Sequence, residues 1–193
     1  IFRCMENAMR VDFHTHTTYS HGKNTPEQNV IAAIARGLRC VAISEHGPAS
    51  LFFGVRGEKF MQLRREVDRL NKRYANDIRV LLGIECNLLG DGVCDLPNDP
   101  AMFDVVLLGF HRAVFLRDSM MRRAVRARLL PPARREDAAV ARAVLHTLER
   151  YPVDIVTHPG EYVPVDIPIL AQGAGELGVL LELNEKHQTL SRE

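Results

Sequence analysis

The sequence predicts an α/β fold built on a parallel β-sheet, open or closed into a barrel. Short, almost wholly apolar runs, such as residues 40–44, 80–84 and 105–108, alternate with segments of helical periodicity. Helices cover both faces of a parallel sheet, so its strands are apolar throughout instead of alternating between apolar and polar residues. We expect the 193 residues to form a single domain, with residues 1–10 as an irregular N-terminal extension.

The first expected strand and helix have local sequence support. Residues 11–14 are strand-like, and the Thr-Pro-Glu-Gln sequence at residues 25–28 offers a capping threonine, a proline at the first helical position and a glutamine that completes a capping box. This helix is expected to run to about residue 36. Gly37 then provides the left-handed residue that commonly ends a helix.

The other elements are expected from the same two periodicities. Further helices are expected at residues 58–75, 118–130, 134–150 and 167–177. Further strands are expected at residues 40–44, 80–84, 105–108, 155–157 and 179–183. Since each strand is followed by a helix or a long connection, the strands should run parallel.

Composition excludes several classes of protein. Lys and Arg number 25 against 24 Asp and Glu, and this net charge of +1 gives no general attraction to nucleic acid. No apolar run reaches the roughly 20 residues of a membrane span. The four cysteines form no C-x-x-C pair, so we interpret them as buried reduced thiols, which favours a cytoplasmic protein.

Most of the histidines fall at the expected ends of strands. The carboxyl ends of parallel strands share one face, where sites of α/β proteins are built. The potential metal ligands at these ends are His14, His16, His21, His46, Glu85, His111 and His158. His146 and His187 fall outside this pattern, and we expect both to be solvated or locally hydrogen-bonded.

These ligand types favour particular metals. His14 and His16 are two residues apart on one strand, so their side chains point to the same side, and Asp12 could orient an imidazole there. Imidazoles with one carboxylate suit Zn, Mn or Fe. Seven ligands are more than one tetrahedral ion binds, so we expect two or three ions in a shared pocket. A pocket with several metal ions is typical of metal-assisted hydrolysis.

Five short motifs resemble a known family. They are V-D-F-H-T-H-T at residues 11–17, S-E-H-G-P at 44–48, G-I-E at 83–85, L-G-F-H at 108–111 and T-H-P-G at 157–160. In order and placement they resemble the PHP (polymerase and histidinol phosphatase) superfamily, most of all its small bacterial phosphatases. The resemblance implies a distorted (β/α)7 barrel with a trinuclear metal site and a small phosphorylated substrate, whose phosphate monoester is attacked by metal-bound hydroxide.

The resemblance also implies which residues hold each ion. His14 and His16 would hold the first ion together with Glu85. Glu85 would bridge to a second ion held by His111 and His158. His21 and His46 would contribute to a third ion.

The chain departs from the family pattern at three places. Glu45 and His21 stand where relatives often have Asp. The final Asp-x-His of the family has no counterpart after Leu183. A closed barrel takes about 250 residues, so we expect an incomplete barrel that lacks its last strand–helix unit. The last strand of such a barrel would have an exposed edge that can pair with another chain. We therefore expect either a homo-oligomer or a further C-terminal segment.

Two basic residues are candidates for binding the substrate phosphate. Nine arginines lie between Arg112 and Arg142, and most of this stretch is expected to be a solvated helical face. Arg112 is next to His111, where its guanidinium could bind a phosphate bidentately. Lys23, in the first loop, is the second candidate.

Two alternatives to a phosphoesterase remain open. Amidohydrolase-type metal hydrolases also begin with H-x-H on their first strand, but they need a strand-end Lys or a lone late Asp, and neither is found. A metal count of three against one or two would separate the two families. The other alternative is a degenerate metal-binding domain with little activity, because the final ligands are absent.

Overall fold

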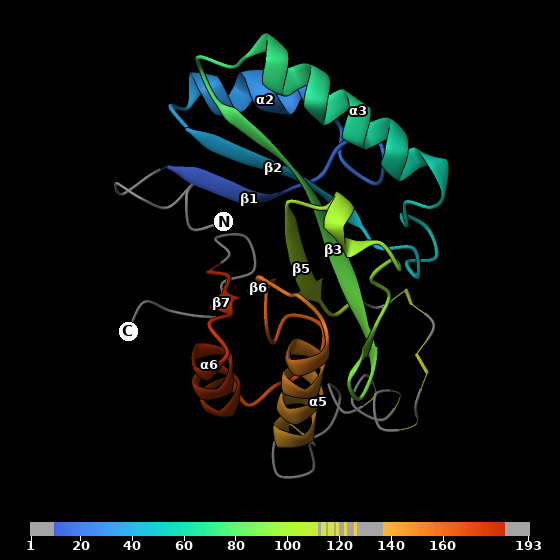
Figure 1. Cartoon of the computed structure of the whole chain (residues 1–193). Helices are drawn as coiled ribbons and strands as arrows, with labels where there is room; N and C mark the ends of the chain where they lie inside the picture. Colours follow the sequence, from blue (N-terminus) through green and yellow to red (C-terminus); the bar gives the residue numbers. More distant parts are fainter. Residues whose placement is uncertain are drawn as a thin grey trace. The chain divides into compact units, whose positions relative to one another are not determined.

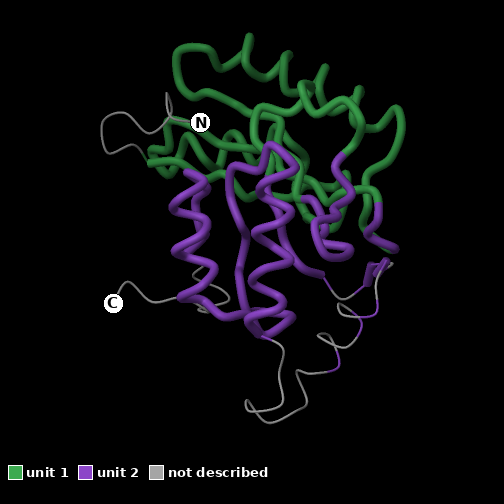
Figure 2. The backbone as a smooth tube through the Cα atoms, turned by 60° about the horizontal axis from the view of Figure 1, so that its bottom comes forward, with its two compact units in different colours: residues 1–48, 52–85, 97–106 green, residues 49–51, 86–96, 107–193 purple. Residues whose placement is uncertain are grey.

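The computed structural model describes residues 10–111, 113–114, 116–117, 119, 122, 126 and 137–183. The chain divides into two compact units, coloured separately in Figure 2. Among the described residues, unit 1 comprises 10–48, 52–85 and 97–106. Unit 2 comprises 49–51, 86–96 and the described residues from 107 onward. The expectation of a single domain stays a prediction.

Unit 1 contains parallel strands covered by two helices. Strand β1 (Val11–Thr15) pairs with β2 (Cys40–His46), which pairs with the first part of β3 (Arg79–Gly90). Helices α2 (Pro26–Ala35) and α3 (Glu58–Arg73) lie side by side along these strands (Figure 1). Strand β2 is buried along its whole length, as expected for a strand inside a parallel sheet.

The beginning and end of α2 confirm the sequence prediction. The Thr25 hydroxyl accepts the Gln28 backbone N–H at 3.3 Å, and the Gln28 side chain accepts the Thr25 N–H at 2.9 Å. This reciprocal pair is the predicted capping box, with Pro26 as the first helical residue. Gly37, with φ of 72°, follows the helix in the left-handed region.

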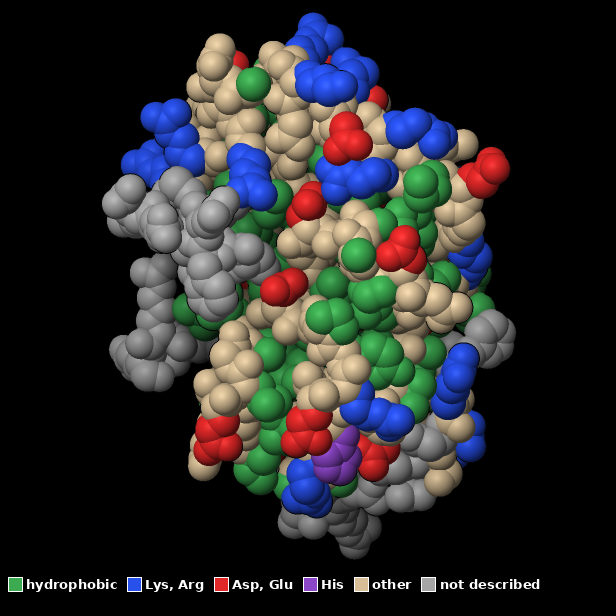
Figure 3. Space-filling view, in the orientation of Figure 1, with side chains coloured by type: hydrophobic (Ala, Val, Ile, Leu, Met, Phe, Trp, Pro, Cys, Tyr) green, Lys and Arg blue, Asp and Glu red, His purple; other side chains and the backbone are tan. Residues whose placement is uncertain are grey.

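The outer surface of α3 is lined by ion pairs. Arg69 contacts Glu27 at 2.9 Å and Glu66 at 2.8 Å, and Arg73 contacts Glu27 at 2.8 Å. Acidic and basic side chains accordingly intermingle over α2 and α3 in Figure 3. Exposed pairs of this kind contribute little to stability, so these contacts add little to the packing of the two helices.

Unit 2 contains the second set of parallel strands. The end of β5 (Val105–Gly109) pairs with β6 (Ile155–Val156), which pairs with β7 (Leu180–Leu181). The helices of this unit, α5 (Asp137–Arg150) and α6 (Ile167–Glu176), contact each other. Within unit 1, a short 3₁₀ turn (Pro100–Met102) precedes β5. The predicted α/β fold with parallel strands is therefore confirmed.

Strand β3 is longer than predicted. It continues beyond residue 84 to Gly90 and turns back through Gly92, with φ of 64°, into the antiparallel strand β4 (Val93–Cys94). Residues 86–89 are all buried, and the pairing of Leu88 with Cys94 and of Gly90 with Val93 extends the strand. Glu85 therefore lies within a strand instead of after it, and His46 is the last residue of its strand.

Other expectations can be compared only in part. Cys40, Cys86 and Cys94 are buried, as predicted, whereas Cys4 lies outside the described residues. The expected helix at 118–130 lies mostly outside them, as do residues 134–136 and the chain after Leu183. Within the described residues, no helix has the length and apolar character needed to cross a membrane.

Candidate metal centre

Unit 1 brings five of the predicted ligands together. β1 supplies His14 and, directly after its last residue, His16. The loop that follows supplies His21. His46, at the end of β2, is the register partner of Glu85 on β3, so the parallel pairing itself sets these two side by side. The pairing of three strands thus gathers residues that are far apart in sequence.

The first candidate group consists of His14, His16 and Glu85, whose ligand atoms all lie within 4.8 Å of one another. The Nε2 atoms of the two histidines are 3.2 Å apart. His14 Nε2 lies 3.2 Å from Glu85 Oε1, and His16 Nε2 lies 3.4 Å from Glu85 Oε2. Ligand atoms around a tetrahedral zinc ion with 2.0–2.1 Å bonds are about 3.3 Å apart. The donor atoms of these three residues therefore have the spacing of a metal's coordination shell.

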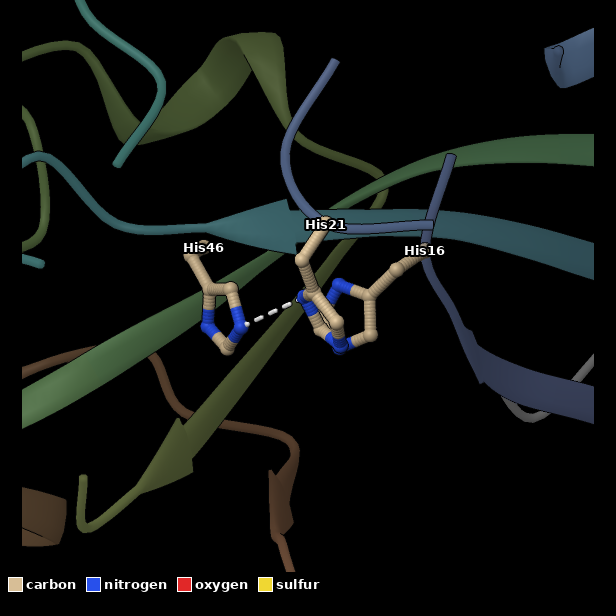
Figure 4. A group of neighbouring side chains, drawn as sticks. All are labelled: His16, His21 and His46. Atoms are coloured by element: carbon tan, nitrogen blue, oxygen red, sulfur yellow. Dashed lines mark hydrogen bonds between the residues drawn. The ribbon is translucent and has the colours of Figure 1, made fainter. Parts of the chain in front are cut away.

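The second candidate group consists of His16, His21 and His46 (Figure 4). His46 Nε2 lies 3.1 Å from His21 Nδ1. The ring of His16 stacks on that of His46 with centroids 4.5 Å apart, and its centroid is 4.4 Å from that of His21. His16 belongs to both groups, so the two groups share its imidazole.

The buried atoms of His16 fit a metal-binding role. Its Nδ1 is buried and makes no hydrogen bond with the described residues, and the closest carboxylate oxygen, Oε2 of Glu45, is 3.8 Å away. A buried polar atom without a hydrogen bond is costly, and coordination of an ion is one way to satisfy it. Burial lowers the pKa of His16, but the nearby carboxylates of Glu45 and Glu85 outweigh burial and raise that pKa above its ordinary value.

Glu45 is held in place by the loop that follows β1. Its Oε1 accepts the backbone N–H of Thr17 at 2.9 Å and the hydroxyl of Thr17, and its Oε2 accepts the hydroxyl of Ser20. Glu45 is fully buried. This carboxylate, which the sequence singled out only as a departure from Asp, fastens the loop that carries His21 to strand β2.

His21 is poised to act as a neutral ligand. Partial burial, together with the neighbouring His16 and His46, lowers its pKa to about 4. The imidazole is therefore uncharged at neutral pH, which is the form that binds a metal. Its ring also lies 5.3 Å from that of Phe53, a half-exposed aromatic residue that sequence reasoning did not single out.

Unit 2 brings His111 and His158 together. Their ring centroids are 5.3 Å apart, and the ring of Tyr162 lies 5.9 Å from His111 and 5.6 Å from His158. His158 is buried, and its backbone N–H donates to Oε2 of Glu182 at 2.8 Å. Sequence reasoning missed Tyr162 and Glu182, although Glu182 falls within the strand expected at residues 179–183 and lies directly after the observed strand β7.

A chain of hydrogen bonds orients His111. Its Nδ1 lies 2.8 Å from Oδ1 of Asn87, and Asn87 in turn donates to Asp95 through its backbone N–H at 2.6 Å and its side chain at 2.7 Å. An amide oxygen accepts, so His111 carries its proton on Nδ1, and Nε2 is the unprotonated nitrogen, the form that can bind a metal. Burial raises the pKa of Asp95, with hydrogen bonds from Asn87 and Ala49 acting against it.

Other predicted residues have different surroundings. Lys23 is exposed in the loop between β1 and α2, and Arg112 and His187 lie outside the described residues. Asp12 is exposed, and its carboxylate accepts the backbone N–H of His14 at 3.1 Å. This hydrogen bond is to the main chain of His14 and not to its imidazole. His146 is exposed and pairs with Asp91 at 2.6 Å, as expected for a histidine outside the site. Convergence of all seven ligands in one pocket stays a prediction.

Sequence comparison identifies the relatives of this chain. The PHP domain family matches residues 12–158. A probable phosphatase of Edwardsiella ictaluri (strain 93-146) is 36% identical over 187 residues, which cover 94% of this chain and 66% of the relative. A probable phosphatase of Shewanella sp. (strain W3-18-1) is 33% identical over 188 residues, or 95% of this chain and 66% of the relative. The chain thus spans about two thirds of the length of these relatives.

Comparison with solved structures supports the fold. The histidinol phosphate phosphatase of Lactococcus lactis, complexed with zinc, L-histidinol and phosphate, superposes with a TM-score of 0.61 at 17% identity. The match covers 91% of this chain and 73% of that structure. The predicted PHP-type fold, here incomplete, is confirmed.

Proposed function

The chain belongs to the PHP domain family, and from that premise we propose that it is a metal-dependent phosphoesterase that hydrolyses a small phosphate monoester. The relatives named as probable phosphatases and the fold shared with a histidinol phosphate phosphatase support a hydrolase of phosphate esters. The metal dependence rests on the residues of this chain.

One observation carries the proposal: two imidazole nitrogens and two carboxylate oxygens face one another at 3.2–3.4 Å in the group of His14, His16 and Glu85. Lone pairs packed this closely repel unless a proton or a cation lies between them. A single proton can serve only one pair of these atoms, whereas a divalent ion serves them all. The donor set of imidazoles and one carboxylate suits Zn, Mn or Fe.

Each group of residues has a proposed part in the reaction. His14 and His16 hold one ion with Glu85, His111 and His158 hold a second, and His21 and His46 contribute to a third. Bound divalent ions supply an activated water at neutral pH and neutralise the phosphoryl oxygens. Asn87 keeps His111 in the tautomer that presents Nε2, and Glu45 keeps the loop of His21 against β2.

The substrate is proposed to be a small phosphorylated metabolite. Lys23 and Arg112 are the proposed contacts to its phosphate, because Arg112 directly follows His111 and Lys23 is two residues after His21 in the sequence. Phe53, whose ring lies 5.3 Å from that of His21, offers an apolar surface to the alcohol part of the ester.

The test compares His14→Ala with His146→Ala. Both substitutions remove one imidazole, but His146 is exposed on α5 and pairs with Asp91. We expect His14→Ala to lose bound metal and at least about a hundredfold in kcat/KM for a model phosphate ester, because losing a group that only orients a ligand already costs about 10- to 100-fold. His146→Ala should keep both. If the two variants hydrolyse the ester equally well, catalysis does not depend on this site and the proposal fails.

A further inference from the structure

His158 has an unusual backbone conformation. Among the residues that the structure describes, it is the only non-glycine residue with a positive φ, at 29°. Residues with a side chain are strained in this region, and such strain persists only where the surroundings hold the backbone in place. The buried histidine that we propose as a metal ligand therefore needs something that keeps its main chain in this conformation.

We propose that Glu182 is a positioning residue, which fixes the main chain of His158 and thereby aims its imidazole at a metal ion. Its Oε2 accepts the His158 backbone N–H at 2.8 Å. This inference rests on the proposed function, because it takes His158 as a ligand. It adds a residue from directly after the last described strand to a site whose other members come from earlier in the chain.

The sheet places the two residues next to each other. Val156 on β6 pairs in register with Leu181 on β7, and the backbone N–H of Glu182 donates to the carbonyl of Val156 at 2.9 Å. Strand β6 ends at Val156, two residues before His158, and Glu182 is the first residue after β7. The main chain of Glu182 is thus fixed by the ladder, and its side chain reaches across to the strained residue.

The imidazole of His158 is supported separately. Its ring packs edge-on against those of His111 and Tyr162, with centroids 5.3 and 5.6 Å away. These contacts restrict rotation of the side chain but leave the backbone free to relax. The carboxylate acts on the backbone itself, and a hydrogen bond to an ionised acceptor is stronger than one to a neutral group. The two kinds of support are complementary.

The experiment measures zinc binding and amide exchange in the 193-residue chain. His158→Ala first identifies which zinc-binding step in a chelator competition titration needs this imidazole. Glu182→Ala should weaken that same step about 10- to 100-fold, the usual effect of removing a group that orients a ligand. The steps lost in His14→Ala should be unchanged. Glu182→Gln keeps an acceptor oxygen and should bind within about threefold of the original protein.

Hydrogen exchange tests the contact without metal or activity. In the metal-free protein, the His158 amide should be protected, and Glu182→Ala should remove that protection while Glu182→Gln retains most of it. Glu149→Ala, which removes an exposed carboxylate from α5, is the matched control and should change neither measurement. If Glu182→Ala leaves both the zinc step and the His158 amide unchanged, the inference is wrong.

A second variant and an activity assay complete the test of Glu182. If Glu182→Ala does not fold, Glu182→Asp replaces it, because the shorter side chain keeps the charge but cannot reach the amide. It should then weaken the His158 step at least about tenfold, and binding equal to that of the original protein would overturn the proposal. Intact protection of the amide in a chain that hydrolyses no phosphate ester would contradict the proposed function but not the contact.

Discussion

The Nε2 atom of His16 lies 3.2 Å from that of His14, and the same imidazole stacks on His46 at a centroid distance of 4.5 Å. His16 is therefore a member of both candidate groups in unit 1, whereas His14 and His21 each belong to one. The consequences of substituting these three histidines should differ accordingly.

We expect His16→Ala to lose metal from both groups, whereas His14→Ala and His21→Ala each weaken only one. Metal content measured by elemental analysis after dialysis should fall further in His16→Ala than in either other variant. Circular dichroism checks that all three remain folded. Equal losses in the three variants would show that His16 is not shared.

The capping box of α2 predicts a change in stability. Thr25→Ala removes the hydroxyl that accepts the Gln28 N–H, and should lower the free energy of unfolding by about 1 kcal/mol. Thr25→Ser keeps the hydroxyl and should lie within a few tenths of a kcal/mol of the original protein. Urea denaturation measures both, and equal stabilities for the two variants would contradict the role of the cap.

Asp95 predicts a pH dependence of stability. Burial raises its pKa above the ordinary 3.8, so the folded protein binds this proton more tightly than the unfolded chain does. The contribution of this carboxyl is complete below pH 3.8 and is lost as the pH rises through the raised value. The stability of the original protein minus that of Asp95→Asn should therefore decrease from below pH 3.8 toward neutrality. A difference that stays constant or rises over this range would contradict the raised pKa.

Phe53 predicts a preference among leaving groups. Its side chain is 45% exposed, and its loop is anchored to β2 because Val55 donates to the His46 carbonyl at 3.0 Å. Phe53→Ala should lower kcat/KM about 3- to 10-fold for an aryl phosphate and less for an alkyl phosphate, because stacking on a flat ring is lost. Met61→Ala removes a comparably exposed side chain from α3 and should have no effect. Equal losses on the two esters would show that Phe53 does not contact the leaving group.

The sequence was informative where a local pattern decides the structure. The capping box at Thr25, the left-handed Gly37 and the apolar run of β2 each depend on neighbouring residues, and each was predicted correctly. The His-x-His spacing likewise predicted that the side chains of His14 and His16 lie close together, and their proximity to Glu85 follows from the pairing of strands.

Features that depend on tertiary contacts were not predictable in the same way. The extension of β3 to Gly90 depends on its pairing with β4, and no property of residue 84 marks the end of a strand. The link from Asn87 to His111 joins residues 24 positions apart. The strain at His158 is a backbone property, and a histidine in the sequence gives no sign of it.

The dispersed origin of the ligands in unit 1 has a consequence for folding. His14, His46 and Glu85 come from three different strands, so their side chains meet only after β1, β2 and β3 have paired in register. The unfolded chain has no such arrangement, and an ion that binds only the folded form stabilises it by mass action. The supply of divalent metal would then set how much of the polypeptide survives as native protein, independently of any reaction it performs.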